Sequence, residues 1–276
     1  MRCSKPHGTL NFRRMKNTPT PQRMMMAQLP AFPPACSACA LRQTENFSVI
    51  QPDELAFIES YRVGTQAVAA GGTIISEHNP RSKIFTLYSG WAFRYKSLSD
   101  GRRQILNFLL PGDLIGLQQE FADSAMHGIE AVTDVTLCVF PRDGLLNLFR
   151  QYPSIGYEIT WLSAREEGYN LVTAGRRNAT ERVAMLLMHL YRRLDRIGLA
   201  IQDADDQPAF VEFPINQQHI ADTLGLSLVH TNKTLRRLQK MGLHELKNGR
   251  LRLLNTKALE RIADYYDKPL RRVPLL

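Results

Sequence analysis

Short apolar runs separated by turns dominate the first half of this 276-residue chain, whereas helical spacing dominates the second half. Between Gly71 and about Pro141, apolar or alternating runs are interrupted by glycine-containing turns at roughly ten-residue intervals. Runs of this length and spacing are typical of a compact antiparallel barrel or roll. The strands expected from them are Ile84–Tyr88, Trp91–Tyr95, Ile105–Leu110 and Val132–Phe140.

Helical spacing is found in three further segments. Residues 52–62 have the pattern of a short amphipathic helix, and residues 179–196 carry leucine and valine along one face. Between them, an alternating four-three spacing predicts one long helix with the seam of a two-stranded coiled coil, and hence a dimer interface. Glu166 interrupts that seam, and the alternative is a helix that packs on its own roll. The seam positions are Ile155, Ile159, Leu162, Glu166, Tyr169 and Thr173.

Residues 217–236 predict two short helices joined by a tight turn. Gly225 suits the turn, because a side chain there would resist a positive φ, and Ser227 is a good N-cap for the second helix. Apolar residues follow one side of each helix at three- and four-residue spacing. These residues are Ile220, Ala221 and Leu224 in the first helix and Leu228, Thr231, Leu235 and Leu238 in the second.

The opposite side of the second helix is polar and cationic, and it contains no acid. Such a face suits a DNA major groove, although many cationic helix faces are merely solvated. Two strand-like runs around Asn248-Gly249 follow it and predict a type I′ hairpin, which completes a winged helix-turn-helix. Between residues 216 and 257 there are eight Lys or Arg and two acids, which favours contact with a phosphate backbone. The face consists of Val229, Asn232, Lys233, Arg236 and Lys240.

The formal charge of +9 is unevenly distributed. Residues 1–34 contain six Lys or Arg and no acid, residues 35–175 eleven against fifteen, and residues 176–276 eighteen against eleven. The basic excess that matters for DNA therefore lies in the last third. We find no run long enough for a membrane helix and no secretory signal, so we expect a cytoplasmic protein without a membrane partner. Four cysteines in a chain of this size do not make a disulfide framework.

With roll, connecting helix and winged helix-turn-helix in this order, the chain resembles the Crp/Fnr family of bacterial transcription regulators. The likeness rests on LLPGDLIG at 109–116, NATERVAMLLMHL at 178–190 and the helix-turn-helix at 215–243. It implies an α+β fold with an N-terminal, cyclic-nucleotide-binding-like antiparallel β-roll. It also implies a homodimer on a two-fold symmetric double-stranded DNA site and RNA polymerase as a partner. The regulator is an activator or a repressor, and the sequence does not distinguish the two. The expected parts are a disordered basic leader (1–34), a sensor roll (35–150), a dimerisation helix (151–177), a winged helix-turn-helix domain (178–257) and a C-terminal tip (258–276).

The resemblance also implies roles for individual residues of the helix-turn-helix. Val229, Asn232 and Lys233 match the base-reading positions of the family, and Val229 stands where an acid is usual. Lys233 replaces the usual arginine, so it lacks the bidentate fork and discriminates less rigidly. The family's half-site sequence therefore does not carry over. Backbone contacts are implied for Gln217, Ser227 and Arg236, and His230 is expected to touch phosphate or base.

Members of the family that bind cyclic nucleotides hold ribose with a glutamate and phosphate with an Arg-Ser pair. Leu117 stands at the glutamate position here, and His127-Gly128 stands where Arg-Ser is expected. The phosphate would lose its cation and its hydroxyl donor. We therefore do not expect cyclic AMP as the signal.

Oxygen-sensing members hold an iron–sulfur cluster on an N-terminal run of cysteines and one distant cysteine. Cys36, Cys39 and Cys138 match three of these positions, and Glu45 stands at the fourth. Three thiolates and a carboxylate form a weaker cluster site than four thiolates. The alternatives are a thiol or zinc sensor, or no sensory role, with Cys138 a small buried strand residue.

The rival from another class is a thiol–disulfide enzyme or metal-dependent redox protein that uses Cys36 and Cys39, with a vestigial helix-turn-helix. Such an active site normally follows a strand and opens a helix, which lowers the pKa of one thiol. Pro33-Pro34 precede the pair here, and no strand pattern is present. We therefore expect a regulator and not an enzyme.

Overall fold

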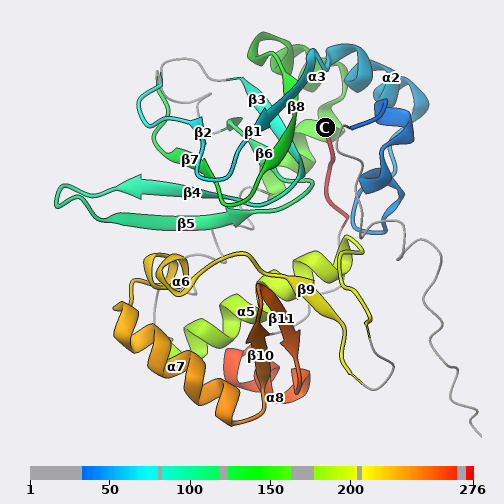
Figure 1. Ribbon diagram of the computed structural model, residues 1–276. Coiled ribbons are helices and arrows are strands. Elements are labelled where there is room, and N and C mark those ends of the chain that lie inside the picture. The colour runs from blue at the N-terminus through cyan, green and yellow to red at the C-terminus, as the bar shows by residue number, and fades with distance from the viewer. Residues whose placement is uncertain (1–32, 80–82, 118–123, 163–176, 204–206, 266–271) are drawn as a thin grey trace, which may run out of the picture.

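The computed structural model describes residues 33–79, 83–117, 124–162, 177–203, 207–265 and 272–276 (Figure 1). Its first part is a roll of two four-stranded sheets, with strand orders β1-β8-β3-β6 and β2-β7-β4-β5. Every strand pair in these sheets is antiparallel, as expected. The strands are β1 (Gly64–Val68), β2 (Thr73–Ile75), β3 (Ile84–Ser89), β4 (Ala92–Ser97), β5 (Arg103–Leu109), β6 (Leu114–Ile115), β7 (Gly128–Ala131) and β8 (Val135–Phe140).

The expected run Val132–Phe140 is wrong at its beginning, because the chain turns there. β7 ends at Ala131, and β8 begins only at Val135. Within the turn, the Val132 amide donates to Trp91 O at 2.8 Å, and the Thr133 hydroxyl accepts from the Trp91 amide at 2.9 Å. An apolar residue at 132 made the turn look like part of a strand.

Helices lie against one end of the roll. α2 (Pro52–Tyr61) confirms the amphipathic helix expected there and α3 (Leu145–Gln151) follows β8. Residues 153–162 are also helical, and Ile155 and Ile159 are buried in the core of their own chain. The first two seam positions thus pack within the chain, as the alternative interpretation expected. Glu166, Tyr169 and Thr173 lie outside the described residues.

The C-terminal domain has the expected winged helix-turn-helix architecture. A three-stranded wing with strand order β10-β11-β9 accompanies four helices. α8 begins at Thr256 and packs on α5, so this domain continues beyond residue 257, where we expected it to end. In the described parts of the chain, no helix combines the length and apolar character needed to cross a bilayer. The elements are α5 (Ala179–Arg196), β9 (Phe210–Glu212), α6 (Gln217–Leu224), α7 (Leu228–Lys240), β10 (His244–Lys247), β11 (Arg250–Leu253) and α8 (Thr256–Ala263).

The two domains share one hydrophobic core. Trp91 of the roll lies 5.9 Å from Phe213 of the C-terminal domain, ring centroid to ring centroid, and both side chains are buried. A separate hydrophobic cluster fills the space between the two sheets of the roll, and it includes Phe85, Leu109 and Ile129. The continuous core means that the helix-turn-helix is held in a defined position on the roll.

Candidate nucleic-acid interface and thiol pocket

Local capping fixes the two helices of the helix-turn-helix. The Asn216 side chain accepts from the His219 amide at 2.9 Å and begins α6, and Gly225 ends it with φ 63° and ψ 35°. The Ser227 hydroxyl accepts from the His230 amide at 3.2 Å and begins α7. A left-handed backbone at Gly225 is favourable only without a Cβ, which is why this glycine identified the turn from sequence.

One side of α7 packs into the domain. Thr231, Leu235 and Leu238 are buried as expected, and Thr234 is buried beside them. Leu228 is 42% exposed, so its assignment to the packed side is wrong. It is the first residue of α7, ahead of the first buried position at Thr231.

The opposite side of α7 forms an exposed surface, which we call the reading face and define as Val229, Asn232, Lys233 and Arg236. Val229 is 79% exposed, Lys233 and Arg236 are exposed, and Asn232 is half-buried. Figure 1 shows α7 at the outer edge of the domain, with α6 between it and the roll. Of the other predicted contact residues, Gln217, Ser227 and His230 are exposed as well.

The two acids of the basic segment do not oppose the reading face. Asp222 lies 3.7 Å from Arg103 of β5 and accepts from Gln218 at 2.6 Å. Glu245 lies 3.7 Å from Arg252 in the wing. Both carboxylates therefore face arginines, which leaves the positive potential of α7 largely uncancelled.

The roll holds the helix-turn-helix through β4, β5 and the turn that follows β5. Gln104 donates to the carbonyl of Thr223 at 3.0 Å, and Phe93 lies 5.5 Å from the His219 ring. Burial, and then the charge of Arg103, lower the pKa of His219. At the other end, Arg193 of α5 donates to Asp113 at 2.6 Å. Sequence reasoning missed this interface, since no local pattern joins residues so far apart.

The site where a cyclic nucleotide would bind is modified at Gly128. A Cβ at this position would come within 2.4 Å of the Tyr95 ring, so a serine does not fit beside that tyrosine. His127 is no substitute cation, because burial first, then Arg94 and Lys96, lower its pKa. At these two positions the site offers neither a hydroxyl donor nor a strong cation for a phosphate.

Cys36, Cys39 and Cys138 come together in the wall of one cavity, which we call the thiol pocket. Its volume is only about 10 Å³, and the C-terminal Leu275 and Leu276 also line it. Burial raises the pKa of Cys36 and raises that of Cys138 to about 11, so both thiols stay protonated at neutral pH.

An iron–sulfur cluster does not fit this pocket as it is packed. A space of about 10 Å³ holds no more than a water molecule, so the packed pocket has no room for a cluster. Glu45, the expected fourth ligand, is exposed on a turn. Among the described residues, we find no group of three potential ligands arranged to hold a metal ion.

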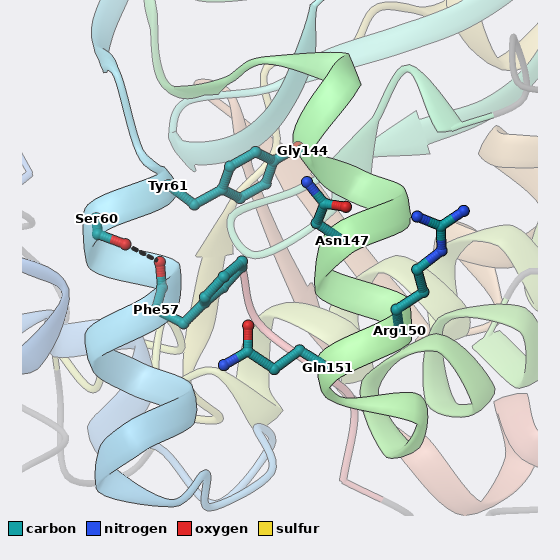
Figure 2. Close-up of a pocket in the computed structure, with 7 residues that line it drawn as sticks. All are labelled: Phe57, Ser60, Tyr61, Gly144, Asn147, Arg150 and Gln151. Atoms are coloured by element: carbon teal, nitrogen blue, oxygen red, sulfur yellow. Dashed lines mark hydrogen bonds between the residues drawn. The ribbon is translucent and has the colours of Figure 1, made fainter.

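A second concavity was not expected from the sequence. It is an open groove of about 590 Å³ between α2 and α3 (Figure 2). Phe57 and Tyr61 form one wall, and Asn147, Arg150 and Gln151 form the other. Gly144 is required there, because a Cβ would lie 2.1 Å from the Tyr61 ring. The groove shares no residue with the reading face or the thiol pocket.

Comparisons with known proteins agree with this architecture. The model of the cyclic nucleotide-binding domain matches residues 65–152, and that of the Crp-like helix-turn-helix domain matches residues 181–262. The nitrogen fixation regulation protein FixK of Bradyrhizobium diazoefficiens is 32% identical over 234 residues, which span 83% of this chain and 93% of FixK. The transcriptional activatory protein AadR of Rhodopseudomonas palustris is 30% identical and covers 69% of this chain and 77% of its own. The structure of FixK2 from Bradyrhizobium japonicum superposes with a TM-score of 0.63 at 27% identity, over 72% of this chain and 96% of FixK2.

Proposed function

Because this chain belongs to the Crp/Fnr family of DNA-binding transcription regulators, we propose that it acts as a homodimer whose two α7 helices read a two-fold symmetric DNA site. The observation that carries the proposal is the reading face, which is exposed, free of acids and followed by a wing. A helix of this kind enters the major groove, where side chains meet base edges.

The reading residues have separable roles in this proposal. Val229, Asn232 and Lys233 face base edges, where asparagine suits adenine and lysine suits guanine, and valine suits a thymine methyl group. Arg236, Gln217 and Ser227 bind phosphates and so fix the position of the helix without reading sequence. His230, beside Val229 at the beginning of α7, contacts phosphate or a base edge.

Dimerisation is proposed through the segment 151–177, whose described part is helical over residues 153–162. Ile155 and Ile159 are buried in their own chain, whereas Tyr157 between them is 65% exposed. Several relatives are named as activators of transcription, which supports activation and RNA polymerase as a further partner. A regulator of bacterial DNA acts in the cytoplasm.

Control of DNA binding is proposed to pass through the interface between roll and helix-turn-helix. A signal that changes the pairing of Asp113 with Arg193, or of Gln104 with Thr223, would change the orientation of α7 relative to the roll. Such a signal must bind the two arrangements with unequal affinity. Cyclic AMP is not proposed as this signal, since Leu117 and Gly128 remove its partners.

The redox alternatives have less support. A thiol–disulfide enzyme needs a thiol with a lowered pKa, but burial raises the pKa of Cys36, which lies in a short 3-10 turn. Binding an iron–sulfur cluster would require the C-terminal leucines to leave the thiol pocket. We therefore propose a regulator that is not an enzyme and has no resident cluster in the state described here.

The test is selection of binding sequences from a pool of random DNA duplexes, together with the mass of the complex by light scattering. We expect enrichment of an inverted repeat whose half-sites are about one helical turn apart, bound by two chains. Enrichment of a single unrepeated site, or of no sequence at any salt concentration, would contradict the proposal.

A further inference from the structure

The last residues of the chain leave the DNA-binding domain and add a strand-like segment to the roll domain. Val273 forms a parallel bridge with Phe47, in which the Ser48 amide donates to Val273 O and the Val273 amide donates to Asn46 O, both at 2.9 Å. Leu275 and Leu276 are only 2% and 5% exposed. We call residues 272–276 the C-terminal tail; Figure 1 shows it in red, running up beside the N-terminal segment.

The tail closes the thiol pocket. Leu275 and Leu276 line the same cavity as Cys36 and Cys138, which are 5% and 7% exposed. Backbone pairing combined with side-chain pockets is a general way in which proteins bind extended peptides. The roll domain therefore carries a peptide site, and its occupant is a segment of the same chain.

The tail site is also joined to the contact that holds the DNA-binding domain. The ring of Phe47, which pairs with the tail, packs on Gly112 so closely that a Cβ there would lie 2.2 Å from it. The next residue is Asp113, which accepts from Arg193 of α5. The tail itself follows α8, which packs on α5. Docking of the tail and pairing of Asp113 thus restrain the same domain from two directions.

The closed pocket leaves several polar atoms unsatisfied. Within the described chain, Arg42 Nε and Nη1, Thr86 Oγ1 and Tyr88 Oη are buried without a hydrogen-bond partner, and all three residues line the pocket. Water reaching an open pocket would satisfy these donors. Closure therefore gains apolar burial and two backbone hydrogen bonds, and it loses hydration of a guanidinium and two hydroxyls. These opposing terms favour a tail that docks reversibly.

We propose that the C-terminal tail is a reversible intramolecular latch, which occupies a peptide site on the roll domain, shields the thiol pocket, and holds the DNA-binding domain in the arrangement described here. Release of the tail exposes Cys36 and Cys138 to solvent and removes one of the two restraints on α5 and α8. The thiols are then reactive only in the unlatched state.

The first test is native-state thiol labelling of the full chain, with Cys3→Ser to remove a background thiol. Leu275→Asp combined with Leu276→Asp puts two carboxylates into the pocket and opens the latch. We expect labelling of Cys138, identified by mass spectrometry, to become at least about tenfold faster. Leu254→Asp, which alters a leucine that is 46% exposed in the DNA-binding domain, is the control and should change the rate less than about twofold. Equal rates in the double variant and the control would overturn the latch.

The second test uses the unmodified chain and so does not depend on a variant that folds. Carboxypeptidase should release Leu276 at least about tenfold more slowly from the protein than from a free RVPLL peptide, because a docked end is cleaved only when it opens. Equal rates would contradict docking.

The third test removes residues 273–276 and adds RVPLL in excess. The peptide should slow labelling of Cys138 again, whereas a scrambled peptide should not; failure of RVPLL to protect would contradict a peptide site. Light scattering should give the same oligomeric state with and without the tail. Dissociation on truncation would show that the tail binds a second copy, and would overturn an intramolecular latch.

Discussion

The reading face and the thiol pocket differ in one physical property, which is access to solvent. Both were candidate sites from sequence, and both have the residue types that their chemistry needs. Lys233 and Arg236 are exposed on α7, whereas Cys36 and Cys138 are buried and covered by Leu275 and Leu276. A surface that binds a rigid duplex must be presented in advance, while a thiol site can be held closed until a signal opens it. The reading face is therefore accessible to its partner in this structure, whereas the thiol pocket is closed to solvent.

The largest effect is expected on DNA affinity, from a change in the reading face. Lys233→Glu reverses one charge on the reading face in each subunit of the proposed dimer, and it removes a donor from the base edges. We expect affinity for the selected duplex to fall about a hundredfold or more, measured by fluorescence anisotropy. Arg261→Glu makes the same charge change on exposed α8 and should cost less than about threefold. Similar losses in both variants would mean that only net charge matters, and that the reading face is not special.

The contact between the roll and the DNA-binding domain should show the next largest effect, which is on stability. Arg193→Ala removes a part-buried, charge-assisted hydrogen bond to Asp113 and should lower the free energy of unfolding by about 2 kcal/mol in urea. The exposed Arg150 offers a matched control, since Arg150→Ala should cause only a small fraction of that change. A loss in Arg193→Ala no larger than the control would show that the domains are not held together here.

A smaller effect on the free energy of unfolding is expected from pH, and it arises from two histidines near the reading face. Burial lowers the pKa of His219, at the interface with the roll, and of His244, behind α7. The unfolded chain binds protons at the ordinary imidazole pKa of about 6.5, whereas the folded chain binds them only at lower pH. Stability is therefore complete above about pH 6.5 and falls as the pH drops below it.

Urea unfolding at pH 7.5 and 5.5 measures this difference. His244→Gln should reduce the loss, and His230→Gln on the exposed surface should leave it unchanged. Stability that rises between pH 7.5 and 5.5 would give the linkage the wrong sign and contradict the burial of these imidazoles.

Replacing a cysteine of the thiol pocket is expected to leave DNA binding unchanged. Protein purified without oxygen should contain far less than one iron or sulfide per chain, and Cys138→Ser should bind DNA as the parent does. This outcome follows from the tail, whose Leu275 and Leu276 line the small thiol pocket beside the cysteines. Stoichiometric iron and sulfide that disappear in Cys138→Ser would contradict it and would establish a redox sensor with an undocked tail.

Local signals explain why the helix-turn-helix was predictable. Gly225 and the Asn248-Gly249 pair have positive φ in the structure, and Ser227 caps α7 as its sequence position indicated. Each of these features depends on neighbours within a few residues. The family resemblance added the order of the domains, and the arrangement of roll and wing agrees with it.

The thiol pocket shows what such signals cannot supply. The family resemblance grouped Cys36, Cys39 and Cys138, which line one cavity, but it could not indicate that Leu275 and Leu276 line that cavity as well. The tail has no distinctive pattern, and its partner Phe47 lies more than two hundred residues earlier. Burial of the thiols, and with it their protonation, is a property of the packed molecule alone.

The most direct test of the reading face is the salt dependence of DNA affinity for the parent chain and for Arg236→Ala, on the selected duplex. Phosphate contacts release counterions, so the logarithm of affinity should fall steeply and linearly with the logarithm of salt concentration. Loss of Arg236 should reduce that slope by about one per subunit while the preferred sequence stays the same. An unchanged slope and affinity in Arg236→Ala would contradict the account, because α7 would then not lie against the DNA backbone.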